Sequence, residues 1–145
     1  MPTPYAHIAC CLDPSPGSER ALEEAVRLRG FGPGRLSLVH ASRLPWASGF
    51  AGAAPDPTDV LEADRTWLTE RAAAAPGAEV VLLEGVAAPT VCDWAEQEGV
   101  DLIVAGAHRG LLQRVALGSF AGYLTHHAPC AVLLVRPSVP EAPAA

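Results

Sequence analysis

Apolar runs alternate along the chain with segments of helical periodicity. The runs, each of which predicts a buried strand, occupy residues 7–12, 36–41, 79–83, 102–105 and 131–135. Between them, apolar residues recur at the spacing of one helix face. Strands that are almost continuously apolar and alternate with helices are typical of a parallel sheet covered on both faces. The pattern therefore predicts an α/β fold.

Four helices are expected between the strands. Ser18 is expected to cap the first helix, and residues 59–75 to form the second. Pro89 suits the first turn of the third helix, which runs to about residue 98, and Ser119 is expected to cap the fourth. Residues 42–57 are rich in Pro, Gly and Ala and show no period, so a loop is predicted there.

Length and composition restrict the class of protein. The 145 residues suit one domain, because domains usually run to about 100–200 residues. We place this domain at residues 1–137, with a disordered tail at 138–145. Half of the residues are apolar, enough for a core that includes Trp67 and Trp94. No apolar run approaches the roughly 18 residues of a membrane span, and no signal peptide is visible. The net charge of −6 argues against a nucleic-acid surface.

The cysteines and histidines do not form a metal motif. Cys10 and Cys11 are adjacent on a predicted strand and should point to opposite faces. The four cysteines lack the CxxC spacing of zinc or thiol-exchange sites. His126 and His127 are adjacent, so they cannot face one metal ion on a helix, and we expect them at the surface. A reduced, cytoplasmic protein with buried thiols is the interpretation that fits.

One residue type is absent from the chain. All ten basic residues are arginine, and no lysine occurs. A Walker-type phosphate loop requires its lysine, as do Schiff-base and pyridoxal chemistry. These function classes are therefore excluded.

Residues 101–136 carry the most informative chemistry. The fourth apolar run ends in Gly106, an arginine-bearing loop follows, and Gly118 with Ser119 opens a helix. Glycine backbone at a helix start is a common way of holding phosphate. Ligands on parallel sheets bind beyond the carboxyl ends of the strands. If the first and fourth strands are neighbours, Asp13 and Gly106 should share one crevice.

These features together resemble a known family. The pattern comprises Asp13 after the first strand, His40 closing the second, Gly85-x-x-x-Pro89, Asp101-Leu-Ile-Val-x-Gly106, Gly118-Ser119 and His127-Ala-Pro-Cys-x-Val-Leu-Leu-Val135. It resembles the universal stress protein family over almost all of residues 5–136. The resemblance implies a Rossmann-like, adenine-nucleotide alpha-hydrolase-like domain with a five-stranded parallel sheet of order 3-2-1-4-5.

The resemblance also implies a homodimer paired through the last strand. The implied edge consists of Ala131, Val132, Leu133, Leu134 and Val135. The sequence supports this edge independently, because a bare apolar edge strand is normally covered or paired.

The nucleotide-binding branch of the family carries a Gly-x2-Gly-x9-Gly-Ser/Thr motif, from which this chain departs. Counting back from Gly118, the second glycine falls on His108 and the first on Ala105. The loop is thus one residue short or shifted, with Gly106 and Gly110 nearby, while Gly118-Ser119 is intact.

The resemblance implies ATP or a related adenine nucleotide as the ligand, with Mg²⁺ as a candidate companion ion. Asp13 would contact the ribose or the base, and Ala41 the adenine. The candidate residues are Leu12, Asp13, Ala41, Gly106, His108, Arg109, Gly110, Gly118, Ser119 and Phe120. Arg114 is a further candidate for phosphate, although exposed loop arginines are more often solvated. Asp13, Gly106 and Gly110 could equally be ordinary turn residues.

Three functions remain open on the sequence. The first is a small homodimeric, nucleotide-binding regulatory protein, in which any turnover is slow because no lysine or positioned base is present. The second is a stress protein of the branch that binds no ATP and acts by protein contacts. The third, a nucleotidyl transferase, is disfavoured by the missing lysine and His-x-Gly-His signature. Protein partners and the physiological signal cannot be derived from the sequence.

Overall fold

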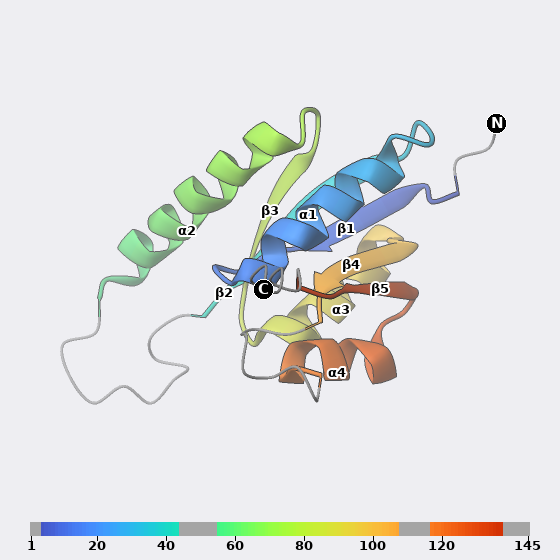
Figure 1. Cartoon of the computed structure of the whole chain (residues 1–145). Helices are drawn as coiled ribbons and strands as arrows, with labels where there is room; N and C mark the ends of the chain where they lie inside the picture. Colours follow the sequence, from blue (N-terminus) through green and yellow to red (C-terminus); the bar gives the residue numbers. More distant parts are fainter. Residues whose placement is uncertain (1–3, 44–54, 108–116, 138–145) are drawn as a thin grey trace, which may run out of the picture.

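The computed structural model describes residues 4–43, 55–107 and 117–137 (Figure 1). Its strands are β1 (His7–Cys11), β2 (Arg35–Ser42), β3 (Glu79–Glu84), β4 (Leu102–Gly106) and β5 (Ala131–Val135). Its helices are α1 (Pro16–Arg29), α2 (Pro57–Arg71), α3 (Ala87–Glu98) and α4 (Ser119–His127), with a 3₁₀ turn at Ala72–Ala74. All predicted strands and helices are confirmed, and their bounds differ from the prediction by a few residues.

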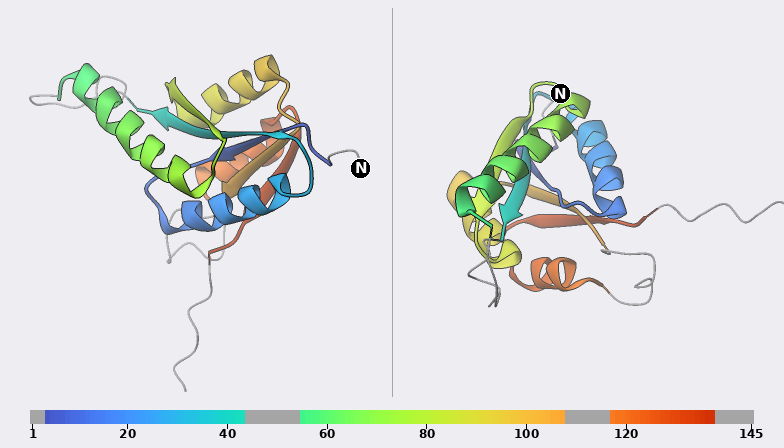
Figure 2. Two further views of the ribbon diagram at one scale, coloured as in Figure 1. Left: turned by 90° about the horizontal axis from the view of Figure 1, so that it is seen from above. Right: turned by 90° about the vertical axis from the view of Figure 1, so that its left-hand side faces the viewer.

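The strands form one parallel sheet in the order β3-β2-β1-β4-β5, as expected. Helices α1 and α2 cover one face, and α3 and α4 the other (Figure 2). Each face has its own apolar cluster. Cys10 belongs to the cluster under α1 and α2, and Cys11 to the cluster under α3 and α4. The two thiols therefore point to opposite faces, as the alternation of a strand requires.

The central strands are the most deeply buried part of the molecule. Every residue of β1 is buried, and so are the first four residues of β4. These two strands pair directly, with Ile8 opposite Leu102 and Cys10 opposite Val104. Helices on both faces exclude water from them, which explains why their sequences are continuously apolar. The outer strands β3 and β5 are only partly buried.

Two helix caps differ from the prediction. Helix α1 begins at Pro16 with Ser15 as its N-cap, so the prediction that Ser18 caps it was wrong. Proline is preorganised for the first helical position, and the Ser18 hydroxyl is bonded to Asp13 instead. Helix α4 has Gly118 as its N-cap, so Ser119 is its first helical residue and not its cap.

Helix α2 starts two residues earlier than predicted and buries little of its surface. It begins at Pro57, because the Asp56 side chain accepts a hydrogen bond from the Thr58 N–H at 2.8 Å and caps the helix. Leu68 is its one fully buried residue. Trp67 packs against the core but is half-buried, as is Trp94 on α3. Among the helices of the described ranges, none is long and apolar enough to cross a bilayer.

Gly85, between β3 and α3, has a backbone conformation that a substitution can test. Gly85 has φ +136°, and an added Cβ would lie 2.7 Å from the Thr90 Oγ1. Replacing Gly85 with alanine is expected to lower the free energy of unfolding by about 1–3 kcal/mol, because L residues are strained at this φ. Urea unfolding of the purified protein measures the change.

Gly122 is the matched control for Gly85. It lies within α4, and a Cβ there would meet no heavy atom within 4 Å. Gly122→Ala should therefore raise stability by about 0.5–1 kcal/mol, the usual gain in a helix interior. Equal effects of the two substitutions would contradict the backbone geometry described for Gly85.

Candidate functional site

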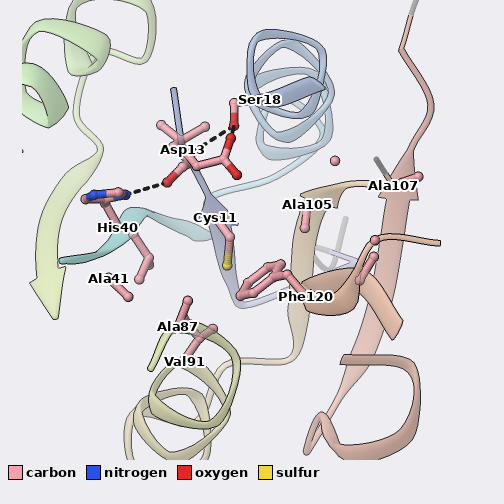
Figure 3. A pocket seen from close by; sticks show the side chains of 15 residues that line it. Cys11, Asp13, Ser18, His40, Ala41, Ala87, Val91, Ala105, Ala107 and Phe120 are labelled. Atoms are coloured by element: carbon pink, nitrogen blue, oxygen red, sulfur yellow. Dashed lines mark hydrogen bonds between the residues drawn. The ribbon is translucent and has the colours of Figure 1, made fainter. Parts of the chain in front are cut away.

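A pocket opens at the carboxyl ends of β1, β2 and β4, beside the first turns of α3 and α4 (Figure 3). It encloses about 580 Å³ of free space, counting the part open to solvent. An apolar concavity with a few polar groups at its edge is the usual form of a small-molecule site.

Six of the ten candidate residues line this pocket. They are Leu12, Asp13, Ala41, Gly106, Gly118 and Phe120. Ser119 begins α4 and is exposed. His108, Arg109 and Gly110 lie outside the described residues, as does Arg114. The structure thus brings together residues from the ends of three strands and the start of one helix.

The crevice follows from the direction in which the chain leaves β1 and β4. After β1 the chain enters α1 on one face of the sheet, and after β4 it continues toward α4 on the other. The two connections consequently leave a space beyond the ends of β1 and β4. Asp13 and Gly106 line this one pocket, as the topology predicted. Gly106 lies against the start of α1, because a Cβ on it would come within 3.2 Å of the Gly17 carbonyl carbon.

Asp13 is held in one orientation by the first turn of α1. The Ser18 hydroxyl donates to Asp13 Oδ1 at 3.0 Å, and the Ser15 N–H donates to the same oxygen at 2.9 Å. The Asp13 N–H in turn donates to Ser18 Oγ at 2.8 Å. The carboxylate is therefore fixed at the pocket edge by contacts within its own turn (Figure 3).

The floor of the pocket is apolar. Cys11 lies there with Val39, Val91, Ala87 and the ring of Phe120 (Figure 3). Burial first, and then nearby Cys92, Cys130 and Asp13, together raise the pKa of the Cys11 thiol to about 12. Cys11 is thus a neutral thiol at physiological pH. It contributes apolar surface and is a poor nucleophile.

His40 forms part of the pocket rim between β1 and α2. Its Nδ1 lies 2.8 Å from the Leu12 carbonyl oxygen (Figure 3). Its Nε2 lies 3.7 Å from Asp64 Oδ2, and its ring centroid is 5.2 Å from that of Trp67. The sequence pattern placed His40 at the end of a strand but did not assign it to the pocket.

Helix α4 presents backbone donors at the pocket edge. Its first intrahelical bond runs from the Gly122 N–H to the Gly118 oxygen at 2.8 Å. The N–H groups of the three residues between them have no intrahelical acceptor. The Gly118 N–H donates to the Ala107 oxygen at 3.2 Å, which ties the helix start to the end of β4. A helix start held in this way suits an anionic group.

Among the pocket residues that sequence reasoning missed, two have side chains with hydrogen bonds at the rim. Ser18 was taken for a helix cap and His40 for a strand end, and both line the pocket. Ser18 could have been suspected, because a serine five residues after Asp13 can return to it across a Pro-Gly turn. His40 could not have been suspected, because the residues that it contacts, Leu12 after β1 and Asp64 on α2, are distant from it in the sequence.

The pocket contains few titratable groups among its described residues. Asp13, His40 and Cys11 are its titratable lining groups in the described ranges. Across these ranges, no cluster of three or more His, Cys, Asp or Glu side chains is placed to hold a metal ion. An apolar floor, a fixed carboxylate and a helix start together suit a flat group joined to hydroxyl and anionic groups. The residues present therefore fit an adenine nucleotide.

The sequence is similar to known proteins over nearly its whole length. Residues 4–136 match the universal stress protein family. Universal stress protein A homolog 1 of Coxiella burnetii is 31% identical over 138 residues, covering 90% of this chain and 96% of that protein. A universal stress protein of Methanothermobacter thermautotrophicus is 41% identical over 56 residues, which cover 39% of this chain and 38% of that protein.

Solved structures share the fold. Universal stress protein UspA from Lactobacillus plantarum is 28% identical, with a TM-score of 0.71 over 91% of this chain and 98% of that one. An Arabidopsis thaliana family member with AMP bound is 15% identical, with a TM-score of 0.64 over 92% of each chain. A universal stress protein in complex with cAMP is 22% identical, with a TM-score of 0.68 over 92% of this chain and 99% of that one. The match over residues 4–136 and the relative that is 31% identical over 138 residues show that this chain belongs to the universal stress protein family.

Proposed function

We propose that this universal stress protein binds an adenine nucleotide in the pocket and acts as a regulatory protein, not as an enzyme. The observation that carries the proposal is the convergence of Asp13, Ala41, Gly106 and Gly118, from four separate segments, on one cavity. Residues that only formed turns would not need to face a common space. The AMP and cAMP complexes of two structural relatives support this class of ligand.

Each part of the nucleotide has a proposed partner. The base would lie on the apolar floor near Ala41, and the Asp13 carboxylate would accept hydrogen bonds from ribose hydroxyls. The start of α4 at Gly118 and Ser119 would face the phosphates, together with His108, Arg109 and Gly110. Asp13 is the one carboxylate among the described lining residues, so Mg²⁺ would be held chiefly by the phosphates of ATP.

Ligand binding should appear as thermal stabilisation. With AMP or Mg²⁺-ATP at 100 times its dissociation constant, stability rises by about 2.7 kcal/mol, and the melting temperature by about 5–10 °C for a domain of this size.

Asp13→Asn keeps an oxygen for Ser15 and Ser18 but removes the charge. It should weaken binding about tenfold, because hydrogen bonds to charged groups are the stronger ones. Calorimetric titration measures the affinity.

Asp93→Asn is the control for the charge change, because Asp93 is exposed on α3 and does not line the pocket. It should leave the affinity unchanged. If neither nucleotide shifts the melting temperature at millimolar concentration and none is released from the denatured protein, the pocket does not bind this class. The chain would then act by protein contacts, as in the branch that binds no ATP.

We also propose that the protein is a homodimer joined through β5. Among the described strands, only β4 pairs with β5, which leaves its other edge open. The Leu133 side chain is 36% exposed on this strand, and Ala131 is exposed beside it on the same face. An open apolar edge strand favours pairing with another chain, and a second copy offers the same edge.

The dimer can be tested with one charge at the edge. Leu133→Asp is expected to convert the dimer to a monomer in sedimentation equilibrium, because the carboxylate would be buried without a partner. Phe31→Asp serves as the control, since Phe31 is 68% exposed in the turn after α1, away from β5. A wild-type protein that sediments as a monomer at micromolar concentration would refute the proposal.

A further inference from the structure

The rim of the pocket and helix α2 meet at a small group of polar side chains. The Ser42 hydroxyl, at the end of β2, donates to Asp64 Oδ2 on α2 at 2.5 Å. The same oxygen faces His40 Nε2 at 3.7 Å. His40 in turn contacts the Leu12 carbonyl at the pocket edge. The His40 imidazole thus lies between Leu12, the residue before Asp13, and helix α2, which covers β2 and β3.

The hydrogen bond to Leu12 fixes the tautomer of His40. A carbonyl oxygen can only accept, so Nδ1 must carry a proton and donate it to Leu12. In the neutral ring, Nε2 then has a lone pair and no hydrogen. This lone pair faces Asp64 Oδ2, which is also an acceptor. Neutral His40 therefore holds Leu12 but makes no hydrogen bond to α2.

We propose that His40 is a proton-dependent latch between the pocket rim and α2. When Nε2 takes up a proton, the ring can donate to Leu12 and to Asp64 at once, and a charge-assisted pair replaces two facing acceptors. The acidic groups on the elements around the ring are Asp64 from α2 and Asp13, which follows β1 and lines the same pocket. Arg71, a cation on the same helix, lies over the ring of Trp67 and pairs with Glu19 at 3.3 Å.

Helix α2 is the element most sensitive to such a contact. Leu68 is its one fully buried residue, and Asp64 adds polar contacts to Ser42 and His40 at the end of β2. Proton uptake and docking of α2 favour each other by linkage. The added attachment is present when the imidazole carries both protons and faces the Asp64 carboxylate, and it is absent when the ring is neutral.

The latch goes beyond the proposed function and does not require a nucleotide. Its test uses the ligand-free full chain, so its outcome is separate from that of the binding experiment. Hydrogen exchange of α2 amides, corrected for intrinsic rates, should be about two- to fivefold slower at pH 5.5 than at pH 8, the range expected for a partly exposed ion pair. Asp64→Asn should abolish this difference, because the amide can still accept from Ser42 but has no charge.

Asp59→Asn is the matched control, since Asp59 is exposed on the same helix. It should retain the wild-type pH dependence. Equal pH dependence in the wild type and in Asp64→Asn would overturn the proposal. A second measurement needs no variant: nitrogen chemical shifts of His40 should show the Nδ1–H tautomer at pH 8 and a doubly protonated ring at pH 5.5. An Nε2–H tautomer at pH 8 would also overturn it.

Discussion

The structure depends on keeping water away from both faces of β1 and β4. Ile8, Ala9, Cys10, Ile103 and Val104 are at most 1% exposed. Burial of one large aliphatic side chain contributes about 1.5–3 kcal/mol, and the shielded backbone bonds of parallel strands require helices above and below. The two helical layers, one on each face of the sheet, satisfy this requirement.

The pocket is a consequence of the same arrangement. Because α1 and α4 must cover opposite faces, the chain turns away from the sheet in opposite directions after β1 and β4. A space opens between the two strand ends, and the residues that line it are those that begin the departing segments. Asp13 is fixed there by Ser18, and Gly106 permits the close approach of Gly17. The shape of the pocket therefore follows largely from the fold itself.

Helix α2 differs from the other helices in how it is attached. Its contact with the sheet relies on Leu68, the half-buried Trp67 and the polar group around Asp64. Elements with few buried apolar contacts open more easily than a core does. His40 belongs both to this polar group and to the pocket rim, so it is a direct contact between the two.

The sequence by itself determined the elements, because continuous apolar runs and turn glycines report burial and backbone shape locally. Its motifs carried the resemblance to the family, and that resemblance implied the sheet order and six of the residues that line the pocket. The sequence placed the helix caps at Ser18 and Ser119 incorrectly, since capping signals compete and only the fold shows which hydroxyl has another partner. Tertiary structure alone decided the position of His40 between Leu12 and Asp64. These residues are far apart in sequence, and no local pattern records which side chains meet when strands and helices pack.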